Sequence, residues 1–265
     1  MNKNTQFCTV QQRIKQMTKK LLNVAVLAIA VQLLNACNSN TKKENEVRSS
    51  SKVVNQNKHV MTKAEQDSLT PEQVLQEFIA GNQRFKNGNV TQREHSEEIR
   101  KAATEGQFPK AMVLSCVDSR VPVEDVFDQG IGDVFVGRVA GNFVNTDLLG
   151  SMEFACKVSG AKIILVMGHQ HCGAVKGAID DVHLGYITSM LANIKPAVAM
   201  SQNFDGEKTS KNEAFVKLVA LNNVKNTMAQ IRAKSLILRT MENKGDLKIV
   251  GAFYTLRTGE LQFLN

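Results

Sequence analysis

Two short segments of this chain carry residue types that could bind a metal ion. Residues 116–120 read CVDSR, and residues 168–174 read GHQHCGA. Two thiolates and an imidazole form a soft nitrogen and sulfur ligand set that favours Zn²⁺. Cys116, His169 and Cys172 would leave a fourth position for water or a carboxylate, as catalytic zinc sites require. We therefore expect one Zn²⁺ per chain.

His169 is the expected histidine ligand, because a helical turn would place it on the same face as Cys172 and turn His171 elsewhere. Simpler interpretations exist for each residue. The two cysteines could be buried thiols or form a disulfide. His169 could be structural, and Asp118 could form a surface ion pair with Arg120.

Alternating strands and helices are predicted to position these segments. Apolar runs at residues 111–115, 134–139 and 162–167 indicate buried strands. Both cysteine segments follow the ends of such strands, where ligand sites gather in parallel sheets. The predicted fold class is α/β, with a mainly parallel central sheet of four to five strands flanked by helices. One helix is predicted to open at Thr70, with Pro71 in its first position and Gln73 completing a capping box, and its apolar positions recur as far as Phe85. The other predicted elements are helices at 92–104, at 147–159 before a closing Gly160 and at 212–243, and strands at 247–254 and 260–264 around a turn at 258–259.

The paired motif Cys-x-Asp-x-Arg and His-x-x-Cys resembles that of the β-class carbonic anhydrases. Four further segments extend the resemblance over residues 69–264. They are residues 106–110 (GQFPK), Phe135 with residues 138–142 (RVAGN), residues 151–155 (SMEFA) and the closing hairpin. The chain departs from many relatives in having Phe154 instead of tyrosine, and Ala-Gly-Asn instead of Ala-Asn. Cys156 lies outside the pattern and is expected to be a packed thiol.

The resemblance implies a zinc-dependent reversible hydration of CO₂ to bicarbonate and a proton, by attack of zinc-bound hydroxide. It implies that Arg120 holds Asp118 off the metal, and that Asp118 orients the hydroxide. Without that hold, Asp118 could become a fourth ligand and close the site. The residues implied in substrate binding are Gln107, Phe135, Phe154 and Gly173. The family's pocket lies at a dimer interface, so a homodimer or tetramer is expected.

Two other functions fit the same residues. One is a related zinc hydrolase on the same scaffold, acting on carbon disulfide or carbonyl sulfide. The other is a non-catalytic zinc- or anion-binding protein, which would have a closed site with four ligands.

The N-terminus has the pattern of an export signal. Residues 1–36 contain five Lys or Arg and no acidic residue, which leaves +3 of the net charge of +8 for the remainder. An apolar stretch at residues 21–34 follows these charges and is shorter than the roughly 20 residues of a bilayer span. These features predict a signal peptide. Because the excess charge is concentrated there, we expect no nucleic-acid partner.

Residues 34–37 (LNAC) resemble the lipobox of bacterial lipoproteins, in which the cysteine is acylated. We therefore expect lipidation of Cys37 after removal of residues 1–36. Residues 37–66 are polar and lack hydrophobic periodicity, which predicts a flexible tether before a domain at 67–265. The expected location is the periplasm or cell surface, with the protein anchored to a bacterial membrane. An uncleaved membrane anchor is the alternative.

Overall fold

The computed structural model describes residues 60–92 and 95–264. The predicted signal peptide, Cys37 and most of the predicted tether lie outside the described residues. The fold extends further towards the N-terminus than the predicted boundary at residue 67, because residues 63–66 belong to the helix α2 (Lys63–Ser68). Thr62 caps this helix, and its Oγ1 accepts a hydrogen bond from the Glu65 backbone N–H at 3.3 Å.

Five strands form one sheet in the order β2-β1-β3-β4-β5. The first four strands are parallel and β5 is antiparallel to β4, which confirms the predicted fold class. The predicted strand ends were accurate to within two residues. The strands are β1 (Ala111–Ser115), β2 (Val134–Arg138), β3 (Ile163–His169), β4 (Lys248–Tyr254) and β5 (Leu261–Leu264).

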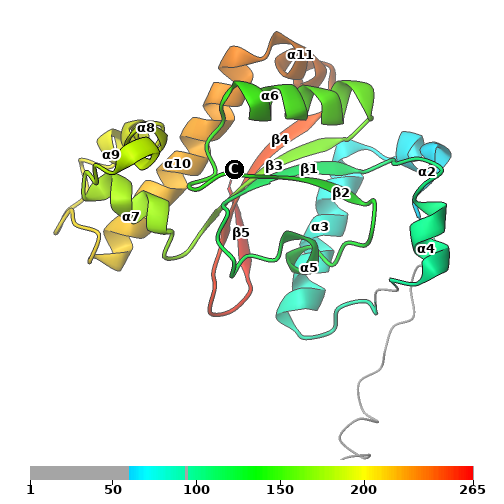
Figure 1. The fold of residues 1–265 in the computed structure, drawn as a ribbon, viewed down its shortest axis with the longest axis horizontal. Coiled ribbons are helices and arrows are strands. Elements are labelled where there is room, and N and C mark those ends of the chain that lie inside the picture. The colour runs from blue at the N-terminus through cyan, green and yellow to red at the C-terminus, as the bar shows by residue number, and fades with distance from the viewer. Residues whose placement is uncertain (1–59, 93–94, 265) are drawn as a thin grey trace, which may run out of the picture. The chain divides into compact units, whose positions relative to one another are not determined.

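Helices cover both faces of the sheet (Figure 1). On one face, α3 (Pro71–Lys86) and α5 (Val123–Val126) pack on β1 and β3. On the other face lie α6 (Thr146–Glu153), the π-helical turn η1 (Phe154–Val158), α10 (Glu213–Lys234) and α11 (Leu236–Lys244). The remaining helices are α4 (Glu97–Ala102), α7 (Gly173–Ile179), α8 (Gly185–Ala192) and α9 (Lys195–Met200).

The helix α3 begins at its predicted cap. Thr70 Oγ1 accepts the Gln73 N–H at 3.2 Å, and Gln73 Oε1 accepts the Thr70 N–H at 2.8 Å. Pro71 occupies the first helical position, where no backbone N–H is needed. The buried face of α3, which includes Val74 and Phe78, completes the core against β1 and β3.

Two predicted helices have different limits. Of the helix predicted at 92–104, the described residues form only α4, which begins after its cap at Ser96. Thr91, just before the predicted start, instead donates its backbone N–H and its hydroxyl to the Asp128 carboxylate at 2.9 and 2.7 Å. The long helix predicted at 212–243 is divided at Ser235, which has an extended backbone. The Ser235 hydroxyl donates to Glu153 Oε1 at 2.6 Å and caps α11 through the Leu238 N–H at 3.1 Å.

Gln66 connects α2 to the start of two strands. Its side-chain amide donates to the carbonyls of Pro109 and Ser159, both at 2.7 Å. Gly160 has φ +84°, and a Cβ there would lie 2.7 Å from Gln66 Oε1. Gly160, which ends the helix predicted at 147–159, is therefore also required because the buried Gln66 side chain approaches it closely.

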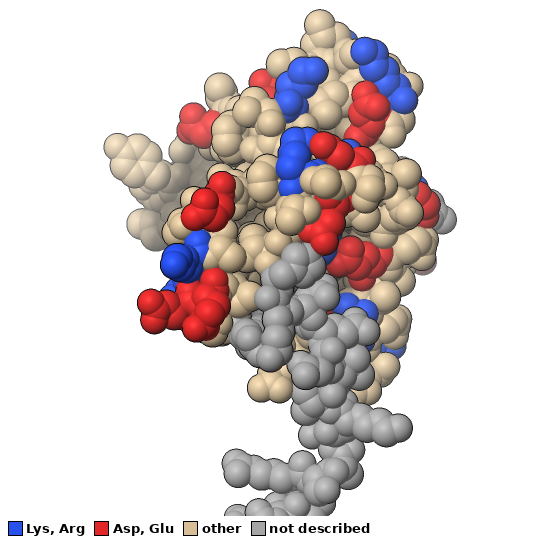
Figure 2. Space-filling view, turned by 90° about the vertical axis from the view of Figure 1, so that its right-hand side faces the viewer, with Lys and Arg blue, Asp and Glu red and all other residues tan. Residues whose placement is uncertain are grey.

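The face shown in Figure 2 carries interspersed acidic and basic side chains. In residues 60–92 and 95–264, no helix combines the length and apolar character that a membrane crossing requires.

Candidate metal centre

Three side chains meet at the carboxyl edge of the sheet. Cys116 directly follows β1, His169 is the last residue of β3, and Cys172 precedes α7. Their candidate ligand atoms all lie within 4.8 Å of one another, and the two sulfurs are 4.0 Å apart. The three residues are only 4%, 1% and 1% exposed. The strands therefore bring all three predicted zinc ligands together in a space shielded from water.

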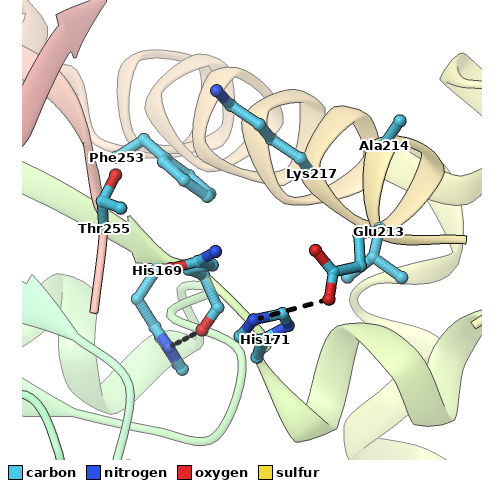
Figure 3. Close-up of a pocket in the computed structure, with 9 residues that line it drawn as sticks. His169, His171, Glu213, Ala214, Lys217, Phe253 and Thr255 are labelled. Atoms are coloured by element: carbon cyan, nitrogen blue, oxygen red, sulfur yellow. Dashed lines mark hydrogen bonds and ion pairs between the residues drawn. The ribbon is translucent and has the colours of Figure 1, made fainter. Parts of the chain in front are cut away.

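A tight turn, and not the predicted helical turn, connects His169 to Cys172. His169 is still in the strand, and His171 has φ +55°, a left-handed conformation that reverses the chain before α7. Gln170 anchors the turn by donating its N–H to the Tyr254 carbonyl at 2.9 Å. His171 points away from the centre towards Glu213, with Nε2 at 3.8 Å from Oε1 (Figure 3).

The imidazole of His169 is oriented for ligation through Nε2. Its Nδ1 lies 2.9 Å from the Gln170 carbonyl, to which only an N–H can donate, so Nε2 carries the lone pair of the neutral ring. Nε2 is buried and has no hydrogen-bond partner among the described residues. A buried polar atom without a partner costs free energy. A metal ion bound by Cys116, Cys172 and this nitrogen would satisfy it, so these residues fit Zn²⁺.

The two thiols interact strongly with each other. The hydrogen bond with Cys172 lowers the pKa of Cys116, and the Gly141 N–H, which lies 3.4 Å from the sulfur, contributes to this shift. The same sulfur–sulfur contact, together with burial, raises the pKa of Cys172. The two shifts have opposite directions, so Cys116 gives up its proton more readily than Cys172, and a bound cation would favour the loss of both protons. Both cysteines are free thiols in this structure.

Arg120 holds Asp118 beside the centre. The guanidinium donates to both carboxylate oxygens, from Nε at 2.9 Å and from Nη2 at 2.7 Å, and the Arg120 N–H donates at 3.0 Å. These hydrogen bonds lower the pKa of Asp118 to about 2. Asp118 Oδ2 lies 3.8 Å from His169 Nε2. An ionised carboxylate, which is a hydrogen-bond acceptor only, is thus fixed next to the metal position.

Gly141 supports the centre in a way that the sequence analysis did not identify. Its N–H contacts Cys116 Sγ, and its carbonyl accepts a hydrogen bond from Asn223 Nδ2 at 2.7 Å. It has φ +85°, and a Cβ there would lie 2.3 Å from Ile194 Cδ1. The segment 138–142 was part of the resemblance, but the residues alone gave no role to this glycine.

The predicted substrate residues are not all brought to this centre within one chain. Gln107 is exposed and precedes the amino end of β1, whereas Cys116 follows its carboxyl end. Five strand residues span about 16 Å. Phe135 and Phe154 contact each other with ring centroids 6.0 Å apart, and Phe154 is 48% exposed. Gly173 adjoins Cys172, and a Cβ there would meet no atom within 4 Å.

A cavity of about 210 Å³ lies behind the turn that follows His169. Figure 3 shows His171 and Glu213 at one side and Lys217 near the ring of Phe253, where Nζ is 5.5 Å from the centroid. The lining residues are His169, Gln170, His171, Glu213, Ala214, Val216, Lys217, Phe253 and Thr255. Of the three candidate ligands only His169 lines this cavity, so the cavity adjoins the metal centre on the side of β3 and does not include Cys116, Cys172 or Asp118.

Comparisons with known proteins agree on one family. A family model described as carbonic anhydrase matches residues 111–261. Carbonic anhydrase 2 of Mycobacterium tuberculosis is 36% identical over 184 residues, which cover 68% of this chain and 86% of the relative. The carbonic anhydrase of Mycolicibacterium smegmatis is 33% identical over 187 residues, which cover 69% of this chain and 87% of the relative.

Solved structures show the same fold. The β-carbonic anhydrase CafA of Aspergillus fumigatus is similar with a TM-score of 0.56 and 28% identity, covering 63% of this chain and 81% of that one. A tetrameric β-carbonic anhydrase of Sordaria macrospora has a TM-score of 0.57 and 23% identity, covering 70% of this chain and 91% of that one.

Proposed function

Because the chain belongs to the carbonic anhydrase family, in its β class, we propose that the Cys116, His169 and Cys172 centre catalyses reversible hydration of CO₂ to bicarbonate and a proton. One observation carries this proposal. Two thiols and the buried, unpartnered Nε2 of His169 converge, while Arg120 holds the Asp118 carboxylate beside them. The cofactor is Zn²⁺.

The residues of the chain divide the chemical work. Zinc, when bound, would supply a Lewis acid that lowers the pKa of water and so makes it a better nucleophile. Asp118 accepts a hydrogen bond and thereby orients the nucleophile, because Arg120 keeps its carboxylate ionised and in place. The Gln170 carbonyl fixes the tautomer of His169. The open space at Gly173, next to Cys172, gives CO₂ room to approach.

The arrangement of Asp118 bears on the two alternative functions. A structural zinc site is closed by a fourth protein ligand. Both oxygens of the Asp118 carboxylate accept hydrogen bonds from Arg120, which favours an open position and therefore catalysis. A hydrolase acting on carbon disulfide or carbonyl sulfide would use the same ligand set, so assays with those substrates distinguish it.

Stopped-flow CO₂ hydration, with zinc counted on the same sample of full chain purified in detergent, tests the function. We expect about one zinc per chain and rapid turnover, because three protein ligands leave one open position. Two thiolates cancel the formal charge of Zn²⁺ and make it a weaker Lewis acid than three neutral histidines would. We therefore expect kcat to rise from neutral towards alkaline pH.

The pKa of Asp118, about 2, places its titration far below this range, so this carboxylate cannot produce the rise. A pH–rate profile that is already flat from acidic pH upwards would contradict the inference that the two thiolates make zinc a weaker Lewis acid. Bound zinc without turnover at any pH would contradict catalysis.

We also propose that the chain works as a homodimer or a tetramer. Gln107 lies at the amino end of β1 and away from its own Cys116, so it can reach a metal centre if a second copy supplies that centre. Exposed Phe154, in contact with Phe135 of the edge strand β2, offers an apolar surface for such pairing. The tetrameric β-carbonic anhydrase of Sordaria macrospora is consistent with this assembly.

We propose that the enzyme acts in the periplasm or at the cell surface, anchored through acylated Cys37. The support is the sequence of residues 1–37, with its charged start, apolar stretch and lipobox-like end. A polar segment after Cys37 would tether the domain to the membrane surface.

A Cys37→Ser variant is expected to move from the detergent phase to the aqueous phase of a Triton X-114 partition after expression in a bacterial host. The reason is that acyl chains supply most of the membrane affinity. CO₂ hydration per zinc should be unchanged, because Cys37 precedes the described fold. A wild-type protein whose intact mass still includes residues 1–36 and no acyl groups would instead support an uncleaved anchor.

A further inference from the structure

A single arginine connects both ends of the loop that carries Asp118. Arg138 is the last residue of β2 and pairs with Ser115 at the end of β1. Its Nη1 donates to the Cys116 carbonyl and its Nη2 donates to the Val121 carbonyl, both at 2.8 Å. Because a guanidinium is planar and rigid, these two bonds fix the separation of the two carbonyls.

The interior of this loop is held by its own hydrogen bonds. The Val121 N–H donates to the Asp118 carbonyl at 3.2 Å, and Arg120 binds the Asp118 carboxylate. These contacts join residues within the loop and preserve its shape. Arg120 Nη2 also donates a long hydrogen bond of 3.5 Å to the His171 carbonyl outside the loop, which holds its position less firmly than the two 2.8 Å bonds of Arg138 do. Val121 is buried at one end and Cys116 at the other, and Arg138 is the side chain that bridges them.

The backbone of Arg138 is held in place by the sheet. The Val139 N–H donates to the Ser115 carbonyl at 3.1 Å, which continues the pairing of β2 with β1 one residue beyond Arg138. The guanidinium therefore starts from a backbone position fixed by the sheet. Its two acceptors are the carbonyl of a metal ligand and the carbonyl that ends the loop.

We propose that Arg138 is a positioning residue for CO₂ hydration, which holds the loop 116–121 so that Asp118 Oδ2 stays 3.8 Å from His169 Nε2. This inference rests on the proposed function. Arg138 acts through Asp118, because its two hydrogen bonds go to backbone carbonyls and not to the ligand side chains or the Asp118 carboxylate. Without the bridge, the loop can shift and the acceptor loses its alignment, and displacements of about 1 Å can cost about 100-fold in rate.

The first test replaces Arg138 with lysine in the full chain. Lysine keeps the charge but cannot bridge two carbonyls in a fixed geometry. We expect kcat to fall about 10-fold to 100-fold, with KM within about twofold and zinc still at about one per chain. The matched control is Arg232→Lys, because Arg232 also donates to a carbonyl, that of Ile249 at 3.0 Å, away from the centre. The control should retain kcat within about twofold.

A double-mutant cycle separates positioning from a general structural effect. If Arg138 acts through Asp118, then Arg138→Lys should lower kcat by less than about twofold in an Asp118→Asn background. Equal losses of kcat in both backgrounds would overturn the proposal. A rise in KM without a fall in kcat would also overturn it, because that result would assign Arg138 to substrate binding.

Hydrogen exchange gives a readout that does not depend on turnover. Peptides covering residues 117–121 should exchange at least about 10-fold faster in Arg138→Lys, because the loop opens more often, while peptides from β3 should be unchanged. Unchanged exchange in the loop would overturn the proposal. If wild-type protein shows no CO₂ hydration, the proposed function fails, and the exchange experiment still decides whether Arg138 holds the loop. Arg138→Gln serves as a second variant if Arg138→Lys does not fold.

Discussion

Replacing Cys172 with serine is expected to abolish zinc binding and to lower kcat by at least about 1,000-fold, because no Lewis acid remains to activate water. Cys172 is 1% exposed, and its sulfur lies 4.0 Å from that of Cys116. A neutral serine hydroxyl cannot replace a thiolate as a zinc ligand. Metal analysis and stopped-flow CO₂ hydration on the same sample measure both effects.

Cys156 provides the matched control for this substitution. It is a free, buried cysteine on η1, where burial raises its pKa to about 12, so it is a packed thiol as expected. Cys156→Ser should cost about 1–3 kcal/mol of stability, since the hydroxyl would be buried in an apolar core. It should retain zinc and full activity per folded molecule. Retention of zinc and activity by Cys172→Ser would contradict the proposed ligand set.

Arg120→Ala is expected to lower kcat by about 100-fold to 1,000-fold while zinc stays at about one per chain. The substitution removes the hydrogen bonds that hold Asp118, whose Oδ2 lies 3.8 Å from His169 Nε2, and the freed carboxylate can then turn towards the metal position. Zinc is retained because its three ligands are untouched. Full activity in this variant would contradict the role of the Asp118–Arg120 pair.

The same variant has a predictable effect on stability at acidic pH. The hydrogen bonds from Arg120 lower the pKa of Asp118 to about 2, against about 3.9 in an unfolded chain. A lowered folded-state pKa stabilises the fold above about pH 4, and this contribution is lost as the pH falls towards 2. The difference in unfolding free energy between wild type and Arg120→Ala, measured on zinc-free protein, should therefore shrink between pH 4 and pH 2. If the difference in unfolding free energy stayed constant between pH 4 and pH 2, that result would contradict the lowered pKa of Asp118.

The strands and their ends could be predicted because strong local patterns encode them. Runs such as residues 111–115 are entirely buried, and short apolar runs of this kind are typical of parallel strands. Both cysteine segments follow such runs, so their convergence at one edge follows from the parallel topology. Thr70 and Gln73 predicted the start of α3 for a similarly local reason.

Features that depend on tertiary contacts could not be predicted in the same way. The break at Ser235 depends on Glu153, which is 82 residues away, so the helical pattern at 212–243 continues through it. The turn at His171 reverses the chain in a left-handed conformation that nothing in the local sequence signalled. The short helices α7, α8 and α9 also escaped prediction.

The docking of α2 determines where a mechanical load would enter this protein. Gln66 fastens α2 to Pro109 and Ser159, which precede β1 and β3, whereas Cys116 and His169 lie at the opposite ends of those strands. Tension applied through the preceding chain would therefore be borne by two hydrogen bonds and the sheet, about 16 Å from the zinc ligands. Because this load enters at the ends of β1 and β3 opposite Cys116 and His169, the length of the strands separates it from the metal centre.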